Sequence, residues 1–343
     1  MTGATGVRCI GLTAAVVTAL LLATVGCKSG TSSEAIDTNA VSDARAGRLP
    51  SCSLAPGPSW LINSFSFLGS PFAHDFGDGV PRNALKVLAN NTIRKQIETQ
   101  IRLGTIQFGI HIVQSMDGGA APLGDGLPQV LDRQAIQTME LLNDPGPGGG
   151  GSAAADLDGG VLCADPQQFD INCKSLSHSD AVSVDGGVIE ASAHIWPIVA
   201  GTFGVGTIAF YDADLQIQKA PPSSTNPHDI DITFYGIWPA CSLGSVIGPG
   251  GANLLDLVTQ LKDDANPFGV QPDFDLRTNQ GIAGNDGGLP VFGNVNGITT
   301  CMIDGETIQG AKCACDPRIN QGYSVALHFE GTAVLVPALC PEN

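Results

Sequence analysis

Several aspartates of this chain lie in short acidic turns and could bind a metal ion. Carboxylate oxygens at alternate positions are typical calcium ligands. Asp75 and Asp78 lie in the stretch HDFGDG, and Asp156 and Asp158 lie in DLDGG. A full calcium loop has oxygen ligands at positions 1, 3 and 5, but with Asp75 at position 1 a glycine, Gly77, stands at position 3. These four aspartates are calcium candidates, and calcium is the only cofactor the sequence suggests. The alternative is that they cap ordinary surface turns.

Two further aspartate pairs have the spacing of metal motifs. Asp212 and Asp214 form one pair, and Asp229 and Asp231 form the other. Each pair lies in a stretch where polar and apolar residues alternate. Every second residue of a half-buried strand faces water, so strand alternation explains both pairs without a metal ion.

Histidine could provide a metal or catalytic centre. Three of the six histidines, His111, His194 and His328, lie on the polar face of a predicted strand. If those strands were neighbours, the three side chains would converge; otherwise they are unrelated surface residues. The chain has no Gly-x-Ser-x-Gly and no phosphate loop, and the glycines of residues 201–206 have the wrong spacing for a dinucleotide fingerprint. We therefore expect a protein that is not an enzyme, with a hydrolase of unrecognised motif as an alternative.

The first 26 residues have the pattern of an export signal. Arg8 is followed by an apolar or small stretch from Cys9 to Val25, and Gly26 precedes Cys27. The stretch is short for a stable membrane-spanning helix, which needs about 20 apolar residues. The sequence therefore predicts a chain that leaves the cytoplasm.

The end of this signal, Thr24-Val25-Gly26-Cys27, resembles the lipobox of bacterial lipoproteins. Gly26 and Cys27 match that pattern, whereas Thr24 stands where leucine is usual. The resemblance implies that residues 1–26 are removed and that Cys27 carries palmitate-type acyl chains that anchor the protein in the membrane. Lys28 stands where an aspartate would favour the inner membrane, so we expect a lipid anchor in the outer membrane, on its periplasmic or surface face. The alternative is an ordinary secretory signal with an incidental cysteine.

The remaining cysteines predict disulfide bonds. Without Cys9, which is removed, and the lipidated Cys27, eight are left: Cys52, Cys163, Cys173, Cys241, Cys301, Cys313, Cys315 and Cys340. An even number in an oxidising compartment favours disulfides. Short separation favours Cys163 with Cys173, and Cys301 with Cys313 or Cys315. The rival is a thiolate metal site around Cys301, but the paired two-residue gaps typical of structural zinc are absent.

Composition and periodicity set the expected fold class: α+β, mainly antiparallel sheet, with disulfide-pinned loops, one long amphipathic helix at 82–103 and a few short helices. The helix rests on apolar residues at gaps of three to five, namely Leu85, Leu88, Ile93, Ile97 and Ile101. Further helices are expected at 127–142 and 251–262. Period-two alternation predicts strands at 105–114, 188–196, 203–219, 229–238 and 323–336, and Asp185-Gly186-Gly187 predicts a hairpin turn.

The domain organisation follows from these features. Residues 1–26 are the signal, 27–47 a lipidated flexible tether, and 48–343 a single large β-rich domain with a glycine-rich loop at 143–160. The net charge of −17 argues against nucleic acid as a partner.

We expect a membrane-anchored lipoprotein with a non-enzymatic binding or structural role at the cell envelope. Its partners would be the membrane, through the anchor, and an unknown protein or apolar ligand. The second hypothesis is a carrier that holds an apolar ligand between helix 82–103 and a curved sheet. Its cavity would be lined by Ile106, Phe108, Ile110, Leu327 and Phe329.

Overall fold

The computed structural model describes most of the chain after residue 53. The described residues are 54–90, 92–102, 107–114, 131–143, 162–170, 173–200, 206–222, 228–246, 253–261, 269–282, 292–336 and 339–340. They all belong to one of the two units into which the chain divides, residues 44–343. The signal, Cys27, Cys52, Asp156 and Asp158 lie outside the described residues, so the predictions made for them stay predictions.

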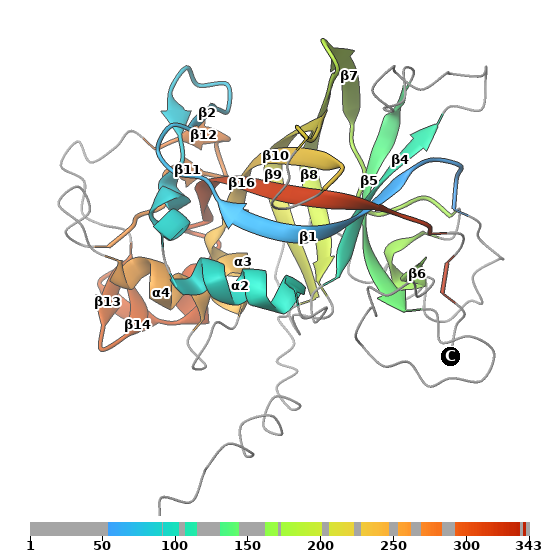
Figure 1. Ribbon diagram of the computed structural model, residues 1–343. Helices are drawn as coiled ribbons and strands as arrows, with labels where there is room; N and C mark the ends of the chain where they lie inside the picture. Colours follow the sequence, from blue (N-terminus) through green and yellow to red (C-terminus); the bar gives the residue numbers. More distant parts are fainter. Residues whose placement is uncertain are drawn as a thin grey trace, which may run out of the picture. The chain divides into compact units, whose positions relative to one another are not determined.

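One large antiparallel sheet dominates the described structure (Figure 1). Most stretches with alternating apolar positions in the sequence become strands of this sheet, because a strand that buries one face alternates apolar and polar residues. In spatial order the strands are β6 (Leu162–Ala164), β5 (Leu131–Asn143), β4 (Phe108–Gln114), β1 (Ser59–Phe67), β16 (Gln321–Val334), β10 (Ile230–Pro239), β9 (Gly206–Lys219), β8 (Val188–Ala200) and β7 (Ala181–Asp185). Two short strands, β11 (Phe274–Asp275) and β12 (Gln280–Gly281), extend it beside β16.

The sheet curls until its two ends meet. Residues just before β7 bond to β5 near the other end of the strand order: Thr138 N donates to Ser177 O at 3.2 Å, and Ser179 N donates to Ile136 O at 2.9 Å. The indole of Trp196 on β8 reaches the same place and donates to Thr138 Oγ1 at 3.0 Å. These contacts close the strand order β5-β4-β1-β16-β10-β9-β8-β7 into a ring.

Aromatic side chains fill much of the main core. The Phe329 ring on β16 lies 5.6 Å from Phe65, 5.5 Å from Phe108 and 6.5 Å from Phe234, measured between centroids. Leu327 is also buried in this cluster. Several residues expected to line a carrier's cavity therefore pack against neighbouring side chains. This packing does not favour the carrier hypothesis, which stays untested.

Smaller elements pack around the sheet. A second sheet contains β13 (Gly293–Val295), β14 (Ile298–Ile303) and β15 (Glu306–Gln309). Short helices accompany it: α3 (Ala240–Ser245), α4 (Leu254–Gln260) and α5 (Ala311–Ala314), and η2 (Pro166–Gln168) lies near β6. The α4 helix matches the helix expected at 251–262, and Asn253 caps it by accepting from Asp256 N at 2.7 Å. A two-strand hairpin joins β2 (His74–Asp75) to β3 (Pro81–Arg82).

The prediction of an α+β fold with one long helix at 82–103 is wrong. Pro81–Arg82 is strand β3, Ala84–Asn90 is a 3₁₀ helix (η1), and only Thr92–Arg102 is α-helical (α2). The apolar spacing explains the division. Leu85 and Leu88, three residues apart, share one face of a 3₁₀ helix, whereas Ile97 and Ile101, four apart, share one face of an α-helix. The described structure is thus mainly antiparallel β with short helices.

The helix expected at 127–142 is also wrong where the structure describes it, because Leu131–Asn143 is strand β5. Both faces of β5 are buried: Ile136 packs in the main core, while Met139 and Leu141 pack in a second cluster. Burial on both faces removes the alternation that identifies a strand. No helix among the described residues is long and apolar enough to cross a membrane.

Three disulfides confirm that the described cysteines are oxidised. Cys301 pairs with Cys313, one of the two partners expected for it, and Cys241 pairs with Cys315. The local pair Cys163–Cys173 is wrong: Cys163 pairs with Cys340, 177 residues away. The fold explains this, since Ala164 and Leu339 form a parallel bridge that brings the two cysteines together. Cys173 also carries a disulfide bond.

Candidate functional site

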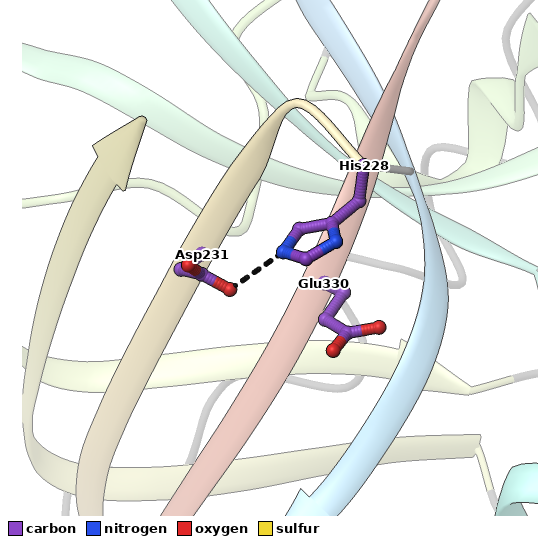
Figure 2. Close-up of side chains that lie close together, drawn as sticks. All are labelled: His228, Asp231 and Glu330. Carbon is purple, nitrogen blue, oxygen red and sulfur yellow. Dashed lines mark hydrogen bonds and ion pairs between the residues drawn. The ribbon is translucent and has the colours of Figure 1, made fainter. Parts of the chain in front are cut away.

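A cluster of histidine and carboxylate side chains lies over β10 and β16 (Figure 2). The ligand-type atoms of His228, Asp231 and Glu330 all lie within 4.8 Å of one another. His228 Nε2 is 2.9 Å from Asp231 Oδ1. A fourth residue joins them, because His328 Nε2 is 3.2 Å from the same Asp231 oxygen. We call these four residues the β10–β16 cluster.

The pairing of two central strands builds this cluster. In the antiparallel register Asp231 stands opposite Glu330, and Thr233 stands opposite His328. His328 and Glu330 share a face of β16 because side chains alternate along a strand. His228 lies three residues before Asp231, where the chain enters β10. Residues about 100 positions apart in sequence therefore meet only through this register.

The electrostatics of the β10–β16 cluster favour a cation. Like charges directly opposite each other in a sheet are destabilising, and Asp231 faces Glu330. Solvent gives limited screening here, since the side chains of His228 and Asp231 are only 7% and 13% exposed. Two imidazoles and two carboxylates make a mixed nitrogen and oxygen donor set. Such a set can hold a divalent metal ion.

A second candidate is a groove on the outer face of the sheet near β7, with a volume of about 370 Å³. Its wall includes Ser183, Glu190, Ser192, Asp214 and Gln216 from β7, β8 and β9.

One end of the groove is formed by a side-chain stack. The His74 ring stacks on Tyr235 at 4.6 Å between centroids, and His74 Nε2 lies 2.8 Å from Asp214 Oδ2. Burial raises the pKa of Tyr235, so its phenol stays protonated and can donate a hydrogen bond.

The acidic turn at 75–78 uses its carboxylates within the turn. Asp75 Oδ1 accepts from Gly77 N at 2.9 Å and from Gly79 N at 2.8 Å. Asp78 Oδ2 accepts from Arg82 Nη2 at 2.8 Å, and this hydrogen bond is the main cause that lowers the pKa of Asp78. These contacts fit the surface-turn alternative. Calcium at Asp75 and Asp78 stays a prediction.

The three strand histidines do not meet. They lie on β4, β8 and β16, and each has a different partner. His194 Nδ1 is 2.8 Å from Asp212 Oδ1 and His328 contacts Asp231. The structure therefore gives no shared centre to the hydrolase hypothesis through these residues.

His111 is buried rather than exposed, contrary to its expected place on a polar face. Its Nδ1 lies 2.9 Å from Ser59 Oγ, and its Nε2 lies 2.9 Å from Ala55 O. The distance would suit a nucleophile and its base. However, Ser59 is 6% exposed and His111 only 1%, so a substrate has no direct access. Burial lowers the pKa of His111, and the pair contributes to the packing of β1 on β4.

Sequence patterns identified Asp231 and His328 separately but missed their association and both other members of the cluster. Asp231 was assigned to a wetted strand face, and His228 and Glu330 were not singled out. The available signals are His228-x-x-Asp231 and His328-x-Glu330. Neither is specific until the β10–β16 register is known.

Comparisons with family models, with curated proteins and with solved structures found no match.

Proposed function

We propose that this chain is an exported lipoprotein, anchored at the cell envelope through Cys27, with a non-enzymatic binding role. The export signal, the lipobox-like TVGC and the polar stretch 28–47 support the anchor. The disulfides among the described cysteines support an oxidising compartment, because such bonds rarely persist in the cytosol. The outer membrane, on its periplasmic or surface face, is the location this proposal favours.

The groove beside β7 is the observation that carries the binding role. Its volume of about 370 Å³ is in the range of small-molecule sites. Hydroxyl, amide and carboxylate groups line it, and the phenol of Tyr235 adds a donor. Glu190 and Asp214 disfavour anions because like charges repel. The ligand class that fits is therefore hydroxyl-rich and either uncharged or cationic.

Anchoring is tested by replacing the lipidated cysteine. Cys27→Ser should abolish incorporation of labelled palmitate and move the protein from the membrane fraction to the soluble fraction. Cys9→Ser is the matched control, because it lies in the segment to be removed and should change neither result. Unaltered membrane attachment in Cys27→Ser would contradict the proposal.

Binding is tested with soluble oligosaccharides of different charge. The full chain in detergent should bind neutral or amino-sugar oligosaccharides, observed by saturation-transfer NMR, and should bind sulfated ones more weakly. Asp214→Asn and Gln216→Ala should each reduce the signal. Glu306→Gln, at an exposed position on β15, is the charge-matched control. If the groove variants bind as the unaltered chain does, the groove is not the binding site.

A further inference from the structure

We propose that the β10–β16 cluster is a binding site for a divalent transition-metal ion of the zinc class, held by His228, Asp231, His328 and Glu330. This inference goes beyond the proposed envelope function. It does not depend on the lipid anchor or on the groove.

The spacing of the donor atoms suits a small ion. Zinc binds imidazole nitrogen at about 2.0–2.1 Å and carboxylate oxygen at about 2.0–2.2 Å, so the ligand atoms of a tetrahedral site lie roughly 3.4 Å apart. In the cluster, Asp231 Oδ1 is 2.9 Å from His228 Nε2 and 3.2 Å from His328 Nε2. The Glu330 carboxylate lies within 4.8 Å of the His228 and Asp231 ligand atoms. Three donors therefore lie close to one point, and His328 reaches the cluster through its contact with Asp231.

The two carboxylates of the cluster also favour a cation. Asp231 and Glu330 stand opposite each other on paired strands, and the His228 and Asp231 side chains are largely removed from water. A divalent ion between the two carboxylates replaces their repulsion by attraction. The net charge of −17 for the whole chain further favours the approach of cations over anions.

The donor types select the class of metal. Calcium prefers six to eight oxygen ligands, whereas this cluster offers two imidazoles among its four side chains. Imidazole suits zinc, copper, nickel and iron, and mixed histidine and carboxylate sets are common for zinc. A bound ion would also connect His228, at the entry to β10, with β16. The alternative is a hydrogen-bonded cluster that holds no ion.

The test measures metal binding directly. The full chain is purified in detergent without a polyhistidine tag, stripped with a chelator and titrated with Zn²⁺ or Ca²⁺ by calorimetry. We expect one Zn²⁺ per chain and much weaker binding of Ca²⁺. Bound cobalt in place of zinc should give the visible absorption bands of a tetrahedral site, a readout of ligand geometry.

Variants assign the ligands. His228→Gln, Asp231→Asn and Glu330→Gln should each weaken Zn²⁺ binding at least tenfold, since even outer-shell partners change affinity tenfold or more. His194→Gln is the matched control, because it alters another outer-face His–Asp pair, and it should bind as the unaltered chain does. Absent Zn²⁺ binding, equal Ca²⁺ affinity, or unchanged affinity in the three ligand variants would each overturn the proposal. Cys27→Ser should bind Zn²⁺ normally, so a failed anchor and a failed metal site are distinguishable.

Discussion

Thr138→Val should destabilise the fold, because Thr138 lies where the sheet closes on itself. Its hydroxyl accepts from Trp196 Nε1 at 3.0 Å and also contacts Ser177 Oγ, all in a buried position. Valine has the same shape but no hydroxyl, so no cavity forms. An orphaned buried donor costs about 1–3 kcal/mol, and the lost contact with Ser177 adds about 1 kcal/mol. The free energy of unfolding should fall by about 2–4 kcal/mol, a large part of a typical stability of about 5–15 kcal/mol.

Urea unfolding of the oxidised Cys27→Ser chain, followed by tryptophan fluorescence, measures this change. Thr307→Val, at an exposed position on β15, is the matched control and should change the free energy by no more than about 0.5 kcal/mol. Adding Ser177→Ala to Thr138→Val should cost less than the sum of the two single changes, because the two hydroxyls contact each other. If Thr138→Val unfolds like its parent, the closing contact between β5 and the residues before β7 is not part of the folded protein.

Three other predictions follow from the same contacts. Cys241→Ser with Cys315→Ser should lower the free energy of unfolding by about 4.4 kcal/mol, since the bond joins residues 74 positions apart; an unchanged urea midpoint would contradict it. Burial holds the pKa of His111 below its unfolded value of about 6.5, so below that pH the unfolded chain binds more protons than the folded chain. The free energy of unfolding should therefore fall as the pH drops from 7 to 5, by up to about 1.4 kcal/mol per pH unit. His111→Gln should flatten that dependence, and an equal slope would refute it. Zn²⁺ at 100 times its dissociation constant should raise the free energy of unfolding by about 2.7 kcal/mol, and Asp231→Asn should lose this effect at the same concentration.

Alternation along single strands was enough to predict several elements of the sheet. The stretches at β8 and β9, residues 230–235 of β10 and residues 327–331 of β16 alternate between more and less buried side chains. Asp185-Gly186-Gly187 joins β7 to β8, and Gly186 and Gly187 adopt positive φ. These signals are local, so a sequence displays them. Glycine at such φ values has no Cβ to clash, which explains the turn.

Prediction failed where burial or pairing depends on distant residues. The β5 strand is buried on both faces and so has no clear period, and Cys163 bonds to Cys340 because Ala164 of β6 pairs with Leu339. The helix prediction merged two elements because gaps of three and four residues both fit an approximate helical pattern. Leu85 and Leu88 belong to a 3₁₀ helix, and Ile97 and Ile101 belong to α2.

The candidate metal site illustrates the same limit. Asp231 and His328 each fit a polar strand face, and that assignment is correct for the strand. Their chemistry appears only when β10 pairs with β16 and places Asp231 opposite Glu330. A different register by one residue would turn the side chains of one strand to the other face and remove the cluster.

Native mass spectrometry of the untagged full chain, extracted from membranes in detergent, tests the central claim most directly. An envelope lipoprotein with a metal site should have the mass of a chain cut before Cys27 and acylated there, plus one zinc ion that a chelator removes. The Asp231→Asn chain should keep the acyl mass and lose the zinc. A chain without added acyl mass would contradict the anchor, and an acylated chain with no zinc, or one whose zinc survives Asp231→Asn, would contradict the site.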